Sequence, residues 1–123
     1  MSKQELSLGE IYDLAKKAMQ FNGCDDANAE AIADIIARAE RDGSHSHGLF
    51  RVPGYVKALR SGKVDGKAKP TIKYLTTAVI QVDGNGCFAP LAQTIGLPAL
   101  AKSTEEIGIA ALSLVGVHHF AAL

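Results

Sequence analysis

The sequence has no excess of charge of either sign and no dense cluster of basic residues. Thirteen Lys and Arg residues balance thirteen Asp and Glu residues, which gives a formal net charge of +0. Proteins that bind nucleic acid need clustered cations to neutralise phosphates, so we expect no nucleic-acid partner. No apolar run reaches transmembrane length, and none follows the first residues as in a signal peptide. We therefore expect no membrane partner and a cytoplasmic location.

Cysteine is scarce as well, with two residues in a chain of 123. Cys24 and Cys87 lie far apart in the sequence and belong to no Cys-x-x-Cys pair. This favours two free, buried thiols over a disulfide or half of a zinc site. The remaining composition, 47% apolar and 21% charged, is typical of a globular protein, and the length suffices for one domain with an ordinary core.

Two helices are predicted in the first forty-three residues. The first begins at the capping-box spacing Ser7-Leu8-Gly9-Glu10 and ends at Asn22-Gly23. Asp25 or Asp26 is expected to cap the second, which runs to Asp42-Gly43. Apolar residues recur at helical spacing in both. They are Ile11, Leu14, Ala15, Ala18 and Met19 in the first helix, and Ala29, Ile32, Ala33 and Ile36 in the second.

A third helix is expected to begin at Ser46, whose hydroxyl suits an N-cap. It should bend or restart near Pro53-Gly54 and end at Ser61-Gly62. A connecting loop rich in Gly, Lys and Pro follows from residue 63 to residue 70. Residues 1–62 therefore form a small three-helix subdomain in this interpretation.

The second half predicts strands around one helix. Residues 71–75 and 78–82 have strand patterns with a turn at Thr76-Thr77, and residues 109–115 form an apolar run typical of a buried strand. The helix between them should be kinked or restarted by Pro98. Its predicted face consists of Phe88, Ala92, Ile95 and Ala99. The fold class is therefore α/β (α+β).

Gly84-x-Gly86-x-x-Ala89 imitates the Rossmann fingerprint, because it lies between a predicted strand and a predicted helix. The fingerprint also needs an acidic residue at the end of the next strand to hold a ribose. Glu105 and Glu106 come before that strand, and Asp83 suits a tight turn. We therefore favour a plain turn over a phosphate-binding loop.

All four histidines fall in two clusters, His45/His47 and His118/His119. A metal site, surface histidines in loops, and a reductase site could each explain them. Reduction of a cyclic imine or a 2-oxo acid needs a hydride donor, a proton donor and a cation for the adjacent carboxylate. On a helix that starts at Ser46, His47 and Arg51 would share one face and supply the last two. Arg51 could equally be a solvated helix charge.

The stretch Arg41-Asp42-Gly43-Ser44-His45-Ser46-His47-Gly48, with Arg51 and Pro53-Gly54-Tyr55-Val56, resembles the signature of the malate/L-lactate dehydrogenase-like oxidoreductases. Two further segments, Val64-Asp65-Gly66-Lys67-Ala68 and His118-His119-Phe120-Ala121-Ala122-Leu123, are most similar to the family's Δ1-piperideine-2-carboxylate/Δ1-pyrroline-2-carboxylate reductases. The resemblance covers nearly the whole chain from about Ile11 onward, and family members are much longer.

The resemblance implies a role for each matching residue. Ser46 would orient the catalytic His47, which donates a proton, and Arg51 would bind the substrate carboxylate. The segment His119, Phe120, Ala121, Ala122 and Leu123 would contact NADPH, or NADH, and no metal is implied. The family's fold is not Rossmann, so residues 63–123 would begin a mixed-sheet α/β cofactor-binding domain. Members are usually homodimers with the active site between domains.

The relay aspartate and most of the nucleotide pocket lie, in the family, beyond Leu123. The chain therefore resembles an N-terminal portion, and we expect it to be inactive alone. The implied substrate is a small-molecule imine or 2-oxo carboxylate. Ala121 favours the imine reductases, because the 2-hydroxy-acid dehydrogenases (malate, lactate or ureidoglycolate type) more typically have glycine there. A binding or assembly module that has lost the rest of the site is the non-enzyme alternative.

Overall fold

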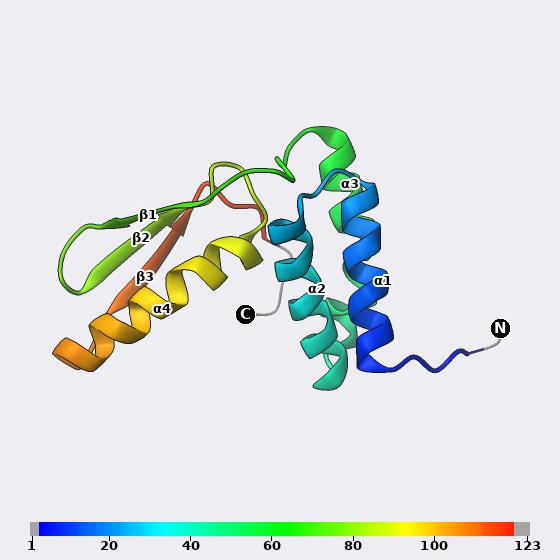
Figure 1. Cartoon of the computed structure of the whole chain (residues 1–123), viewed down its shortest axis with the longest axis horizontal. Coiled ribbons are helices and arrows are strands. Elements are labelled where there is room, and N and C mark those ends of the chain that lie inside the picture. The colour runs from blue at the N-terminus through cyan, green and yellow to red at the C-terminus, as the bar shows by residue number, and fades with distance from the viewer. Residues whose placement is uncertain (1–2, 120–123) are drawn as a thin grey trace.

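Helices α1 (Leu8–Phe21) and α2 (Asp26–Arg41) lie side by side in the computed structural model, which describes residues 3–119 (Figure 1). The predicted capping box is present, since the Ser7 hydroxyl accepts from the Glu10 N–H at 3.1 Å and the Glu10 carboxylate accepts from the Ser7 N–H at 2.7 Å. Asp25 caps α2. The predicted stripe of α2 is buried, whereas Leu14 on α1 is 52% exposed and lies outside the core.

Helix α3 (Val52–Ser61) follows two short 3-10 turns, η1 (His45–His47) and η2 (Leu49–Arg51). The prediction of a single helix from Ser46 is therefore wrong. Gly48 separates the two turns with a ψ of −137°, which lies outside the helical range. Ser44, and not Ser46, precedes the first turn. The predicted restart is confirmed, because Pro53 lies in the first turn of α3, and Gly62 ends the helix at φ 76°.

Strands β1 (Thr71–Tyr74), β2 (Val79–Asp83) and β3 (Ala111–Val115) form a mixed sheet in the order β1-β2-β3. β1 and β2 pair antiparallel, and β2 and β3 pair parallel. The Thr76 hydroxyl accepts hydrogen bonds from the amides of Ala78 and Val79, which confirms the predicted hairpin turn. The α/β fold class is confirmed, with α4 (Ala89–Ile107) lying along one face of the sheet (Figure 1).

Two predictions about α4 need correction. Of the predicted kink or restart at Pro98, the restart is absent, because the helix runs unbroken from Ala89 to Ile107. Its sheet-facing side contains Gly96, where an added Cβ would come within 3.0 Å of Leu112 and Val82 side chains. Ile95, which we expected on that side, is 36% exposed. The apolar periodicity predicted that Ile95 faces the sheet, whereas Gly96 does so, because a glycine adds no apolar side chain to the pattern.

Strand β3 occupies the edge of the sheet, and its residues are half-buried or exposed. The prediction of a buried strand is therefore wrong for the residues that the structure describes. An edge strand offers its outer N–H and C=O groups for pairing with further chain.

The segment Asp83 to Gly86 is a tight turn, as predicted. Asp83 accepts from the Asn85 N–H at 2.8 Å, and Asn85 and Gly86 both have positive φ. Gly84 lies against Gly116, whose carbonyl oxygen would be 2.9 Å from an added Cβ. Close packing between two chain segments therefore accounts for this glycine.

Two hydrophobic clusters meet at residues 87 and 88. Phe88 packs with the three helices, and Cys87 packs with Ala68, Val82 and Ala92 beneath the sheet. Cys24 and Cys87 are buried free thiols, as expected. Within residues 3–119, no helix is long and apolar enough to cross a membrane. The division into domains at residues 62 and 63 stays a prediction.

Candidate active site

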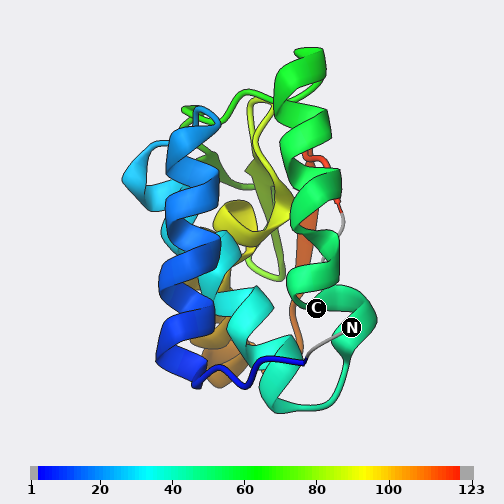
Figure 2. The ribbon, with the colours of Figure 1, turned by 90° about the vertical axis from the view of Figure 1, so that its right-hand side faces the viewer.

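The signature stretch lies at the start of α3, where η1 and η2 join α2 to that helix (Figure 2). The Ser46 Oγ and His47 Nδ1 atoms are 3.0 Å apart, within hydrogen-bond distance. Ser46 is exposed and His47 is half-buried. A hydroxyl on Nδ1 fixes which ring nitrogen remains for other partners, so this pair can present Nε2 to a ligand.

Arg51 is the last residue of η2, and not a position one turn after His47 on a shared helix face. The expected i, i+4 arrangement is therefore absent, although both residues lie in the same pair of turns. Among the described residues, the buried Nε of Arg51 has no hydrogen-bond partner. A buried donor without an acceptor costs free energy. An anion placed beside the guanidinium would remove that cost.

Cations dominate the chain around this site. Histidines apart, the charged residues between positions 43 and 64 are Arg51, Lys57, Arg60 and Lys63. A hollow of about 290 Å³ lies along α3 and is lined by Lys57 and Lys63 together with His118 from the segment after β3. Gly54, Ala58 and Ser61 complete its lining. A hollow with two ammonium groups favours an anionic ligand.

An aromatic stack fixes the wall behind the hollow. The rings of Tyr55 and Phe88 are 4.8 Å apart, and those of Phe88 and His118 are 5.9 Å apart, both edge to face. The His118 N–H donates to Cys87, and the Ala89 N–H donates to His118. Burial raises the pKa of Tyr55 to about 12, although the charge of Arg51 opposes the shift. Tyr55 is therefore a neutral packing residue at ordinary pH and not an acid or base.

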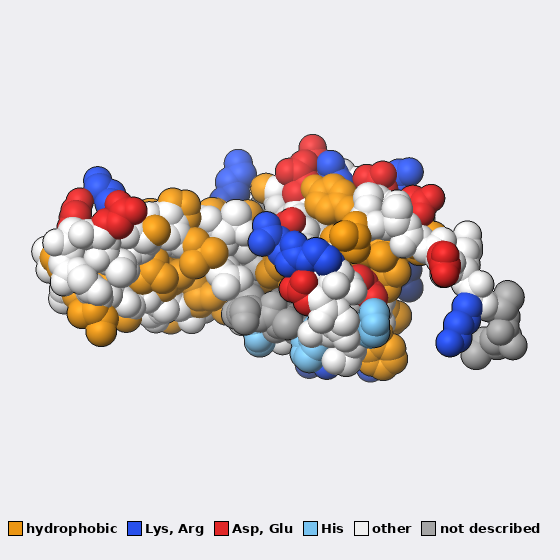
Figure 3. Space-filling model, turned by 90° about the horizontal axis from the view of Figure 1, so that it is seen from below, with side chains coloured by type: hydrophobic (Ala, Val, Ile, Leu, Met, Phe, Trp, Pro, Cys, Tyr) orange, Lys and Arg blue, Asp and Glu red, His pale blue; other side chains and the backbone are white. Residues whose placement is uncertain are grey.

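The predicted nucleotide segment is described only at its first residue. His119 is exposed, and Phe120, Ala121, Ala122 and Leu123 lie outside the described residues. Histidine side chains are grouped on the side of the helical part that Figure 3 shows. Within residues 3–119, no three His, Cys, Asp or Glu side chains are placed to hold a metal ion.

Sequence reasoning missed Glu40, in the last turn of α2. Its carboxylate accepts from the Leu49 N–H at 2.9 Å and pairs with His45 Nδ1 at 2.6 Å. It also fills the space beside Gly48, where an added Cβ would overlap it. A glutamate in an amphipathic helix gives no sequence signal of a contact nine residues away.

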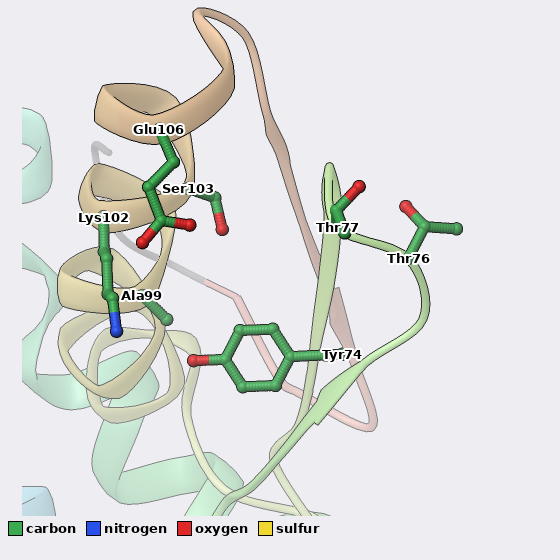
Figure 4. A pocket seen from close by; sticks show the side chains of 7 residues that line it. All are labelled: Tyr74, Thr76, Thr77, Ala99, Lys102, Ser103 and Glu106. Carbon is green, nitrogen blue, oxygen red and sulfur yellow. The ribbon is translucent and has the colours of Figure 1, made fainter.

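A second hollow of about 350 Å³ lies between the β1–β2 hairpin and the C-terminal half of α4. Figure 4 shows the Tyr74 ring extending from the strand toward the helix, where Lys102 and Glu106 also line the space. This hollow contains no histidine or arginine and lies at the far end of the sheet from the signature (Figure 1). The candidate active site is therefore the signature end of α3.

The family described as Malate/L-lactate dehydrogenase matches residues 6–123. A Delta(1)-pyrroline-2-carboxylate reductase of Ancylobacter novellus is 47% identical over 96% of this chain and 35% of its own length. The crystal structure of delta1-piperideine-2-carboxylate reductase from Pseudomonas syringae superposes with a TM-score of 0.94 at 40% identity, covering 98% of this chain and 36% of that one.

The malate dehydrogenase of Entamoeba histolytica superposes with a TM-score of 0.87, over 98% of this chain and 34% of that one. At 24% identity, this likeness shows the fold alone. The chain spans about a third of the length of the curated relatives that it matches. It belongs to the malate/L-lactate dehydrogenase family of oxidoreductases.

Proposed function

We propose that this chain supplies the substrate-binding and proton-donating part of an NAD(P)H-dependent reductase. The substrate is a cyclic imine carboxylate, Δ1-pyrroline-2-carboxylate or Δ1-piperideine-2-carboxylate, and the product is L-proline or L-pipecolate. Support comes from relatives with those names that are 40% to 47% identical over nearly the whole chain. The observation that carries the proposal is Arg51, which lies in the turn after the Ser46–His47 pair and whose buried Nε has no hydrogen-bond partner among residues 3–119.

Reduction of the C=N bond adds a hydride to carbon and a proton to nitrogen. The nicotinamide supplies the hydride when it is bound. His47 supplies the proton, since imidazole is the side chain that enzymes most often use as a general acid or base. With Ser46 on Nδ1, the proton leaves from Nε2 and the ring returns to its neutral form.

Arg51 binds the carboxylate that neighbours the imine carbon. Its planar guanidinium can donate two parallel hydrogen bonds to one carboxylate, which fixes the substrate's orientation as well as its position. The otherwise unpaired Nε supports this role. Because Arg51 and His47 lie in consecutive turns, the substrate's carboxylate and its nitrogen can be held by one short stretch of chain.

The residues around His118 suit part of a nicotinamide nucleotide. The hollow along α3 has apolar walls at Gly54 and Ala58, and Lys57 and Lys63 at its sides match phosphate charge. His119 and residues 120–123 follow it directly in the sequence. We propose that this segment contacts the nucleotide. The preference for NADPH over NADH, the homodimer and the cytoplasmic location stay predictions.

Two other functions remain open. A 2-hydroxy-acid dehydrogenase acting on malate, lactate or ureidoglycolate would use the same histidine and arginine, and the family's description favours it. A binding or assembly module would use the fold without turnover. The imine reductase is preferred because the relatives above are 40% or more identical to this chain over the aligned region, whereas the malate dehydrogenase structure is 24% identical over its aligned region.

The test is to complete the site. The chain is joined to the part of the Pseudomonas syringae reductase that lies beyond the region of match, and this fusion is called the completed enzyme here. We expect NADPH oxidation that depends on the cyclic imine, and slower or no oxidation with pyruvate or oxaloacetate. We expect no turnover from the 123-residue chain alone, since catalysis needs all reacting groups to be positioned together. Preference for the 2-oxo acid in the completed enzyme would contradict the proposed substrate.

A further inference from the structure

We infer that Glu40 is the positioning residue of the signature, a role that rests on the proposed function of Ser46 and His47. One carboxylate holds both flanks of that pair. Its Oε2 atom pairs with His45 Nδ1 at 2.6 Å, one residue before Ser46, and its Oε1 atom accepts from the Leu49 N–H at 2.9 Å, two residues after His47.

The turns themselves provide little rigidity. The backbone hydrogen bonds of η1 and η2 are local: the amides of His47, Gly48 and Arg51 donate to carbonyls three residues earlier. Turns of this type are short and weakly held. Ser46 and His45 are exposed, so burial does not order them either. A contact from outside the loop is therefore needed to select one conformation.

Glu40 is itself well anchored for this task. It belongs to the last turn of α2, whose inner face is buried against the other helices. In the pair with His45, the Glu40 side chain is 16% exposed and the His45 side chain is 72% exposed. The carboxylate also occupies the place of a side chain at Gly48, so a residue with a Cβ there would displace it. The glycine and the glutamate thus form one fitted contact.

The experiment uses nuclear magnetic resonance of the 123-residue chain. In Glu40→Ala we expect amide exchange at Leu49 to accelerate on the order of tenfold or more, since a charge-assisted hydrogen bond is lost. The ring nitrogen signals of His47 should move toward those of the urea-unfolded chain, while the amide signals of α1 and α2 stay in place. A purely structural role at the end of α2 would leave the His47 ring signals unchanged.

Glu40→Gln keeps an oxygen that can accept from Leu49, so it should restore most of the protection and the native His47 signals. Glu30→Gln is the matched control on the same helix, because Glu30 pairs with Lys16 and lies in the first half of α2, ten residues before Glu40. Native Leu49 exchange and native His47 signals in Glu40→Ala would overturn the inference. If Glu40→Ala does not fold, the test rests on Glu40→Gln. Unfolded-like His47 ring signals in a folded Glu40→Gln would then overturn the inference. The Leu49 exchange and the His47 ring signals are measured on the 123-residue chain and do not depend on turnover by the completed enzyme. A completed enzyme without activity would therefore contradict the proposed function but not the role of Glu40.

Discussion

Arg51→Lys separates a carboxylate-binding arginine from a solvated helix charge. The change keeps one positive charge but removes the planar guanidinium and its buried, unpaired Nε. If that Nε donates to the substrate carboxylate, one hydrogen bond to a charged group is lost, which is worth about 1.5–3 kcal/mol. The expected fall in kcat/KM of the completed enzyme is therefore about 10- to 150-fold, at about 1.4 kcal/mol per factor of ten.

Folding should respond differently. The Nε has no protein partner among the described residues, so its removal breaks no hydrogen bond and relieves the cost of a buried, unpaired donor, and the free energy of unfolding should not fall. Arg60→Lys is the matched control, since Arg60 is an exposed arginine on α3, the helix that follows Arg51 directly. Steady-state kinetics with the cyclic imine and a denaturant titration measure the two quantities on each variant.

A direct binding assay supports the kinetics. In the 123-residue chain, the Nε–H signal of Arg51 should shift when L-proline is added, and that of Arg60 should not. An unchanged kcat/KM in Arg51→Lys, or an equal fall in Arg60→Lys, would refute the carboxylate-binding role. A large loss of stability in Arg51→Lys would show instead that the arginine is a folding residue.

Three further changes test the site and its support. His47→Ala in the completed enzyme should lower kcat far more than it changes KM, because proton donation acts in the transition state; a kcat near that of the unchanged enzyme would contradict this. Phe88→Ala should lower the free energy of unfolding by about 3–5 kcal/mol, since Phe88 is fully buried, whereas Phe21→Ala, at an 87% exposed side chain, should change it little. Burial raises the pKa of Cys24 from 9.0 to about 11. The folded state thus favours the protonated Cys24 thiol, which contributes fully to the free energy of unfolding below pH 9, and this contribution should be lost as the pH rises from 9 to 11. Denaturant titrations of Cys24→Ala provide the comparison, because that variant has no thiol to ionise and should not show this loss.

Local chemistry explains what could be predicted from the sequence. The Ser7 capping box, the Asp25 cap and the Thr76 turn each depend on hydrogen bonds between residues at most three positions apart. The buried stripe of α2 follows from its period alone. The Rossmann fingerprint could also be rejected from the sequence, because Glu105 and Glu106 come before the next strand and not at its end.

Long-range packing explains what could not be predicted. The helix expected from Ser46 is interrupted at Gly48, where the carboxylate of Glu40 comes from another helix. The inner face of α4 is set by Leu112 and Val82 packing against Gly96. Neither contact leaves a periodic signal, since glycine is the residue that permits it in both cases. The candidate site could therefore be located from its sequence motif, but its backbone geometry could not be predicted.

The position of His118 has a consequence for the number of ligands that the site holds. Arg51 is the N-cap of α3, and Gly54 and Ala58 lie three and seven residues after it along the helix. The lining of the hollow runs along α3 from Gly54 past Ala58 to Ser61 and includes His118. The helix from Arg51 to Ser61 spans about 15 Å, so the far end of the hollow lies well beyond a carboxylate bound at Arg51. If Arg51 holds the substrate acid as proposed, the part of the hollow toward Ser61 and Lys63 is left for a second ligand, and the proposed order along α3 is substrate first and nucleotide second.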